Sequence, residues 1–310
     1  MSSKSKKPFR LMTIPLFLIL VIWMAMVAAG CGSAAQGSNT VETFNATLKP
    51  LADQSAAALT TVAQTESSCY DDITKIFPAG LLNLQIVSLQ SIGSDKSKEL
   101  AACGPKLTQA NATLGIAING LKAVILPAGC DSCKNGLDTL NAAVNDAEKN
   151  VAQSIDLINF GSAILAARDD EMNKLMAIPN LGDNIITEHE MINMYRSQAA
   201  AYTAAIAKWK TFKEPEFADK IQAVIDAKQA QADIANKQAD DQSMMQILEV
   251  QMAIGQEESD ALQRSMNAES QLFQAIQDKL LGLKNSIDRD KASADRVAGN
   301  LTQNGATTKN

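Results

Sequence analysis

The chain has 310 residues, 4% of them aromatic and 20% charged, with a formal net charge of −6 and a single histidine. An acidic chain is a poor match for nucleic acid or for electrostatic binding to anionic lipid. Few aromatic residues and only eight prolines favour long helices over a thick globular core. The sequence contains no Gly-rich phosphate loop, nucleophile elbow or Ser/His/Asp set, so we expect a protein without catalytic activity or cofactor.

The first thirty residues have the pattern of an export signal. A basic start with Lys4, Lys6, Lys7 and Arg10 precedes an uncharged stretch from Leu11 to Ala29, and Val27-Ala28-Ala29-Gly30-Cys31 follows. Small residues before a Cys, directly after an apolar run, resemble the lipobox of bacterial lipoprotein precursors, although Ala28 replaces the usual Leu. The resemblance implies that residues 1–30 are a signal peptide and that Cys31 is acylated and becomes the N-terminus. The protein would then be extracytoplasmic and held to a bacterial cell membrane by its lipid.

An uncleaved signal-anchor helix is the alternative, because the 19 residues from 11 to 29 could just span a bilayer. Removal of residues 1–30 would take away four basic and no acidic side chains, which changes the formal net charge from −6 to −10. Residues 31–40 would then be the lipidated Cys and a small, polar, flexible tether.

Residues 41–130 predict an N-terminal helical segment. We expect helices over 41–76, 81–92, 96–103 and 106–126, with a kink or restart at Pro50. Gly104-Pro105 and Pro127 are expected to end the helices before them.

Residues 131–298 predict a heptad-patterned three-helix coiled-coil unit. Apolar residues recur every seven positions over 132–177 and 185–212, and again from residue 245 to residue 301. No Pro follows Pro215, so the last helix is expected to be one rod of about 80 residues, roughly 120 Å long. A rival interpretation breaks this rod near Ile254 to Glu258. The fold class is all-α, an elongated antiparallel helical bundle or coiled coil with one very long C-terminal helix, followed by a disordered tail over 299–310.

The best-formed apolar seam lies on this last helix. Polar residues at Ser259, Glu269 and Asp290 interrupt it, which can fix register at some cost in stability. We expect the seam to be buried against the chain's own helices or a second copy. Its residues are Met245, Leu248, Met252, Leu262, Met266, Phe273, Ile276, Leu280, Leu283 and Ile287.

Four cysteines remain once Cys31 is set aside, and an even number in an exported protein suggests two disulfides. We favour the pairs Cys69–Cys103 and Cys130–Cys133. A redox pair at Cys130 and Cys133 is the alternative, but no βαβ pattern surrounds it. A zinc site would need further ligands, and no histidine lies nearby.

Three further groups of residues are expected to have structural and not catalytic or metal-binding roles. His189 lies in Glu188-His189-Glu190 and is expected on a solvated helix face, as is the acidic run 169–171. Tyr195, Tyr202 and Trp209 are spaced by seven residues and are expected in the core or, failing that, in an interface.

The function that these features favour is a structural, scaffold or assembly role through protein–protein contact, with a partner or by self-association. The alternative is an α-helical pore-forming or membrane-remodelling protein. Its candidate segments, Leu81 to Ile92 and Leu157 to Ala167, are both shorter than the roughly 20 residues that a helical span needs.

Overall fold

The computed structural model describes residues 36–76, 93–128, 130–179, 187–240 and 248–306, and all regular structure in these ranges is helical. This confirms the all-α fold class with a very long C-terminal helix. The elements are α2 (Gln36–Ile76), α4 (Gly93–Lys122), α5 (Asp131–Met176), α6 (Glu188–Trp209), the 3-10 turn η2 (Pro215–Phe217), α7 (Ala218–Asp240) and α8 (Leu248–Ala306).

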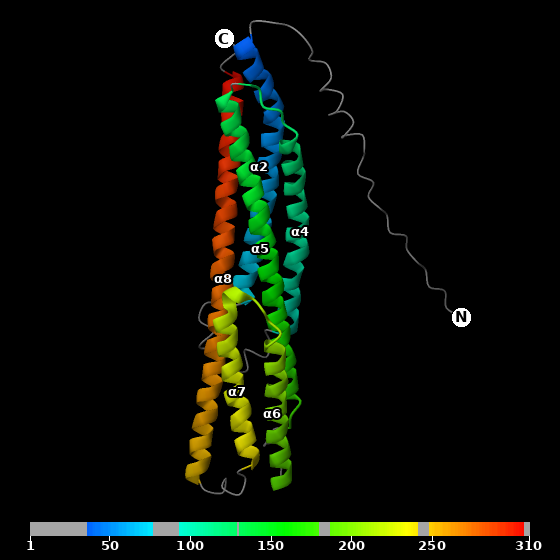
Figure 1. Ribbon diagram of the computed structural model, residues 1–310. Coiled ribbons are helices and arrows are strands. Elements are labelled where there is room, and N and C mark those ends of the chain that lie inside the picture. Colours follow the sequence, from blue (N-terminus) through cyan, green and yellow to red (C-terminus); the bar gives the residue numbers. More distant parts are fainter. Residues whose placement is uncertain (1–35, 77–92, 129, 180–186, 241–247, 307–310) are drawn as a thin grey trace, which may run out of the picture.

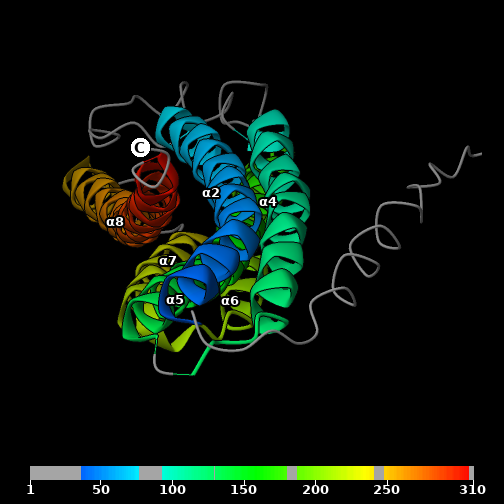
Figure 2. The same ribbon diagram turned by 90° about the horizontal axis from the view of Figure 1, so that it is seen from above.

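The helices form two antiparallel bundles that follow one another along a rod (Figure 1). In the first bundle α2 and α4 pack with the first part of α5 and the last part of α8. In the second bundle α6 and α7 pack with the last part of α5 and the first part of α8. Figure 2 looks along the rod and shows α2 between α4 and α8. Helices α5 and α8 therefore run through both bundles and join them.

The core of the first bundle is apolar and follows the heptads. Each helix turns a stripe of residues inward at about seven-residue spacing, because this spacing returns side chains to one helix face. Each fully buried aliphatic side chain stabilises the fold by about 1.5–3 kcal/mol. The stripe residues include Leu107, Leu114 and Leu121 on α4, Leu137, Val144 and Val151 on α5, and Leu280, Ile287 and Ala294 on α8.

An aromatic cluster lies where the two bundles meet. Phe160 of α5 stacks on Phe217 of η2, with ring centroids 5.6 Å apart. Phe212, in the turn between α6 and η2, packs edge-on against Phe160 at 5.8 Å and against Trp209 at 5.5 Å. Such pairs add about 0.5–1.5 kcal/mol each beyond their buried area, so they fix the turn after α6 against α5.

The single C-terminal rod is wrong: α7 ends at Asp240 and α8 begins at Leu248, and the two pack against each other as antiparallel neighbours (Figure 1). The helices on either side of residues 241–247, which lie outside the described residues, are antiparallel, and the chain does not break near Gly255, which is inside α8. A hairpin buries the inward faces of both helices, whereas a straight rod would have left the α7 face without a partner.

Proline is a weaker helix breaker here than expected. Pro50 lies inside α2 and Pro105 inside α4, and both helices continue past them. Each proline is exposed, while buried residues flank it: Leu48 and Ala52 around Pro50, and Cys103 and Leu107 around Pro105. Their burial offsets the roughly 3 kcal/mol that an interior proline costs. The predicted helices 96–103 and 106–126 are thus one helix, which ends at Lys122, and the segment 81–92 lies outside the described residues.

Helical structure extends into both ends of the chain that the sequence predicts to be flexible. Helix α2 begins at Gln36, within the predicted tether, and α8 continues to Ala306, within the predicted tail. At this end of the rod, the core of the first bundle also contacts the partly buried side chains of Val41, Val297 and Leu301. Both helices therefore continue further than predicted. The predicted boundary at residue 130 runs through the first bundle, because α5 packs on α4.

Candidate functional site

The interior of the second bundle holds more buried polar and charged side chains than that of the first. Buried there are Lys228, Gln231 and Gln238 of α7, Glu171 of α5, and Ser265 and Glu269 of α8. Long charged side chains are almost never fully buried unless they are paired. We therefore take this interior as the candidate functional site.

Lys228 is at the centre of a buried charge cluster that joins three helices. Its Nζ lies 2.7 Å from Oε2 of Glu171 and 2.8 Å from Oε1 of Glu269. Arg168 of α5 contacts the other oxygen of Glu269, with 3.2 Å between Nε and Oε2. Two cations therefore face two carboxylates, and the cluster is neutral when all four groups are ionised.

Burial and neighbouring charge set the protonation of these groups. Burial lowers the pKa of Lys228, but Glu269 and Glu171 outweigh it and raise that pKa above its usual value. Burial also raises the pKa of Glu269, and the charges of Lys228 and Arg168 reverse this and hold it below the usual range. For Glu171 burial prevails over Lys228, and its pKa is raised. Lys228 is therefore a permanent cation whose charge is balanced first by Glu269.

Aromatic side chains of α6 cover this cluster. The Nζ of Lys228 lies 5.7 Å from the ring centroid of Trp209, within the range of a cation–π contact. Tyr202 lies one heptad earlier, and burial followed by the carboxylates of Glu171 and Glu258 raises its pKa to about 12. Tyr202 stays a neutral phenol at physiological pH and also lines a pocket beyond the cluster.

A second buried acid lies in the first bundle. Glu66 of α2 is 1% exposed, and its Oε1 accepts a hydrogen bond of 2.7 Å from Oγ of Ser154 on α5. Burial raises the pKa of Glu66 to about 7, against the smaller effects of Ser154 and Lys284. Nearby, burial and then Asp146 raise the pKa of Asp290 to about 6, while Asn150 donates a hydrogen bond to its carboxylate.

The cysteines are paired as favoured from the sequence. Cys69 of α2 and Cys103 of α4 form a disulfide with their Cα atoms 5.7 Å apart, and Cys130 pairs with Cys133 at 5.2 Å. The N-cap of α5 is Cys130, whose sulfur accepts from the backbone N–H of Cys133 at 3.3 Å. Cys31 lies outside the described residues.

Half of the predicted seam on α8 is fully buried in the chain's own core. Phe273, Ile276, Leu280, Leu283 and Ile287 are buried, and Leu262 and Met266 are half-buried. Met245 and the side chains of Leu248 and Met252 lie outside what the structure describes. The seam thus packs on other helices of the same chain, one of the two arrangements expected.

The prediction that the acidic run 169–171 lies on a solvated helix face is wrong for Glu171. Asp170 is exposed, but Glu171 is buried on Lys228, because α5 turns this position toward the interior. His189 is exposed, and Tyr195 and Trp209 are buried, as expected. In the pore-forming alternative, the segment 157–167 was a membrane candidate, yet Leu157, Ile158, Ile164 and Leu165 belong to the bundle core.

Lys228 was not predicted as a site residue, although its heptad position can be read from the sequence. Ile221, Lys228 and Ala235 are spaced by seven residues and all three are buried, so a lysine occupied a core position of α7. Glu269 was recognised as a polar interruption of the α8 seam, and it is the partner of that lysine. A buried cation on one seam and a buried anion on another are a signal that they pair.

No family model, curated protein or solved structure matches the chain. Within the described helices, none combines the length and the apolar character needed to cross a membrane. Among the described residues, no group of three or more His, Cys, Asp or Glu side chains is placed to hold a metal ion.

Proposed function

We propose that the protein is a lipid-anchored, extracytoplasmic helical rod that acts by contact with a protein partner and has no catalytic role. One observation carries the proposal. Helix α2 begins five residues after Cys31, at the end of the rod where α8 also ends, and the second bundle lies at the opposite end (Figure 1).

The geometry suits a spacer. Helix α8 has 59 residues, which is about 88 Å at 1.5 Å per residue. A lipid on Cys31 would hold the first bundle at the membrane, and a rod standing upright would carry the second bundle about that far from the surface. The mature net charge of −10 gives the rod no electrostatic attraction to anionic lipid, so the anchor alone would set its distance.

The first test is the mature N-terminus. We expect mass spectrometry to find an acylated Cys31 at the start of the chain, and Cys31→Ser to release the protein from the membrane fraction. Cys69→Ser is the matched control, because it also removes one thiol and leaves the signal unchanged. An intact segment 1–30 on the mature protein would contradict the lipid anchor.

The second test concerns contact. A photo-crosslinking residue replaces one exposed residue in each bundle, Ala204 on α6 or Ile116 on α4, in the full chain in its native membrane. We expect a discrete crosslinked partner from position 204, because that bundle is the one held away from the membrane. Crosslinks from neither position, together with leakage of dye from liposomes treated with the protein, would favour the pore-forming alternative.

A further inference from the structure

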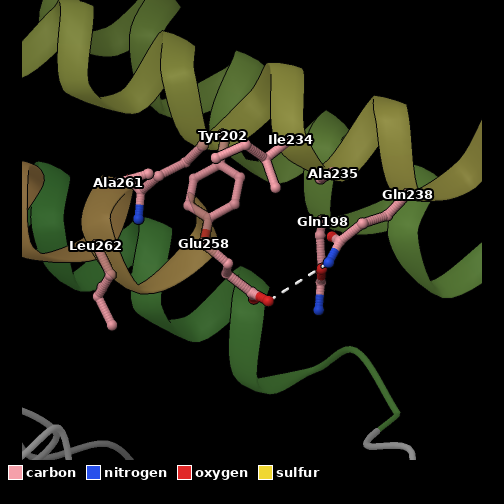
Figure 3. Close-up of a pocket in the computed structure, with 9 residues that line it drawn as sticks. Gln198, Tyr202, Ile234, Ala235, Gln238, Glu258, Ala261 and Leu262 are labelled. Atoms are coloured by element: carbon pink, nitrogen blue, oxygen red, sulfur yellow. Dashed lines mark hydrogen bonds between the residues drawn. The ribbon is translucent and has the colours of Figure 1, made fainter. Parts of the chain in front are cut away.

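The two bundles present different surfaces to their surroundings. In the second bundle, a small pocket among α6, α7 and α8 has polar lining residues, and the exposed Glu258 accepts a hydrogen bond of 3.4 Å from Nε2 of Gln238 there (Figure 3). In the first bundle, α4 and α5 are joined by residues 123–128, Ala-Val-Ile-Leu-Pro-Ala, which contain no polar or charged side chain. We call residues 123–128 the apolar loop.

The apolar loop exposes two adjacent aliphatic side chains. Ile125 is 89% exposed and Leu126 is 38% exposed. The other exposed large apolar residues of the described chain, Ile116, Met176 and Leu281, are far apart in sequence. Single exposed aliphatic side chains are common on protein surfaces, but apolar residues exposed side by side mark a surface that makes a contact.

The rest of the apolar loop is held in place by the first bundle. The N–H of Val124 donates to the carbonyl of Leu121 at 3.1 Å, and the N–H of Cys130 donates to the carbonyl of Pro127 at 3.4 Å. The side chain of Val124 packs against the core, and the disulfide between Cys130 and Cys133 closes the start of α5. The fold therefore holds the exposed pair outward.

The apolar loop lies at the end of the rod that the lipid anchor would hold. In Figure 1, α4 ends and α5 begins at the end where α2 begins and α8 ends. Gly136, near the start of α5, lies against Leu48 of α2 and Val297 of α8. The loop is thus a neighbour of the first turns of α2.

The chain before α2 is long enough to let a lipid on Cys31 lie level with the apolar loop. Gly136 comes five residues after the start of α5, and Leu48 comes 12 residues after the start of α2. Helix α2 therefore projects about seven residues, roughly 10 Å, beyond α5. The five residues from Cys31 to Gln36 span up to about 17 Å, which exceeds that projection.

We propose that the apolar loop is a second membrane contact beside the lipid anchor, with Ile125 and Leu126 in the interface of the bilayer. This inference rests on the proposed anchoring at Cys31. The aliphatic side chains gain by leaving water, while water and headgroups at the interface still solvate the polar backbone of the loop. A lipidated protein is held more stably when a second contact supplements its acyl chains.

The charges beside the apolar loop permit this contact. Exposed Lys122 and Lys134 flank it, and the one acid in residues 122–134 is Asp131, so an anionic headgroup is not repelled there. Because α2 projects beyond the loop, contact through the loop leans the rod toward α4. The second bundle is then held somewhat closer to the membrane than in an upright rod.

A tryptophan in the apolar loop tests the contact in the full mature protein. Ile125→Trp is reconstituted into phosphatidylcholine vesicles with brominated acyl chains, which quench tryptophan inside the bilayer. We expect its emission to be blue-shifted and to lose intensity relative to unbrominated vesicles. The parent supplies the background of Trp209, which is buried in the second bundle. Ile116→Trp, at an exposed site further down α4, is the matched control and should not be quenched.

A charge at the neighbouring position tests whether the loop itself enters the lipid. Leu126→Asp, added to Ile125→Trp, should abolish the quenching, because a carboxylate is costly to move into a bilayer. Ala112→Asp places the same charge at an exposed site of α4 and should leave the quenching unchanged. Positions 112 and 126 are both exposed, so both variants should fold.

Flotation of the protein with the vesicles reports on the anchor separately. Protein that floats without quenching at position 125 keeps its anchor but overturns the membrane contact, and leaves the loop to a protein partner. Quenching at both 125 and 116 would mean that α4 lies along the membrane, and equal effects of the two Asp variants would mean that the loop is not what enters the lipid. Either result overturns the proposal. Protein that does not float overturns both the anchor and the loop contact.

Discussion

At the scale of single residues, Glu66 makes stability depend on pH. An acid whose pKa is raised from 4.5 to about 7 by folding binds its proton more tightly in the folded chain. Its contribution is therefore complete below about pH 4.5, is lost as pH rises to about 7, and stays lost above that. The size of the effect is on the order of 3 kcal/mol.

We expect Glu66→Gln to be more stable than the parent at pH 8 and to differ little from it at pH 4.5. Urea unfolding followed by circular dichroism at both values gives the comparison. Asp290 also has a raised pKa, so the variant keeps part of the parent's slope. Glu257→Gln, an exposed site, should leave the parent's curve unchanged. Equal slopes for the parent and Glu66→Gln would show that folding does not raise the pKa of Glu66.

The charge cluster offers a second prediction at this scale. Lys228→Met leaves two buried carboxylates facing each other beside Arg168, and breaking such a buried pair costs about 3–5 kcal/mol. The double variant Lys228→Met and Glu171→Gln leaves the neutral Arg168–Glu269 pair in place and should recover most of the loss. Urea midpoints of the three proteins decide this. A loss below about 1 kcal/mol in the single variant would mean that water reaches the cluster.

At the scale of elements, the contribution of the buried half of the α8 seam to the free energy of unfolding can be measured directly. Ile276 and Leu283 are 4% and 6% exposed, so truncation of either to Ala should destabilise the protein by about 2–5 kcal/mol. Leu262→Ala should cost less, because Leu262 is half-buried beside the pocket. Gln263→Glu, on the exposed face, is the control. Variants that melt like the parent would mean that the seam contributes little to the fold.

The two disulfides should contribute unequally. The Cys69–Cys103 bond spans 34 residues and joins two helices, which restricts the unfolded chain by roughly 4 kcal/mol, whereas the Cys130–Cys133 loop gives only about 1–2 kcal/mol. We expect reduction to destabilise the parent and a Cys130→Ala/Cys133→Ala variant by similar amounts. It should have little effect on Cys69→Ala/Cys103→Ala. The unreduced, denatured protein should show no free thiol among these four cysteines.

The elements also show which features of the fold can be predicted from sequence patterns and which cannot. The heptads of α5 and α8 placed Val144, Val151, Leu280 and Ile287 in a core, because apolar spacing is a property of the sequence alone. The turn between α7 and α8 could not be placed, since residues 241–247 contain neither Gly nor Pro. Only the packing of the two helices on each other reveals that reversal. The Lys228 charge cluster joins three helices, so its full set of partners depends on their packing and not on the spacing along one helix.

At the scale of the whole molecule, α5 and α8 make one body of the two bundles. Each helix has an apolar half in the first bundle and a half with buried charge in the second, Glu171 on α5 and Glu269 on α8. Loss of either bundle would expose the shared helices of the other. The Lys228 and Leu283 variants, at opposite parts of the rod, should therefore lower the same cooperative transition.

The hairpin of α7 and α8 replaces the single C-terminal rod predicted from the sequence, and a single ion pair can test it. Nζ of Lys237 on α7 lies 3.1 Å from Oε2 of Glu257 on α8. In one continuous helix these residues, 20 positions apart, would be about 30 Å apart. A zero-length carbodiimide crosslinker should therefore join Lys237 to Glu257 within one chain, and mass spectrometry of the digested monomer should find that peptide. The ion pair between Lys279 of α8 and Glu216 of η2, with 2.9 Å between Nζ and Oε1, serves as the positive control. If the control crosslink forms and the Lys237–Glu257 crosslink does not, or forms only between chains, the reversal at 241–247 is wrong and the continuous rod of about 120 Å is restored.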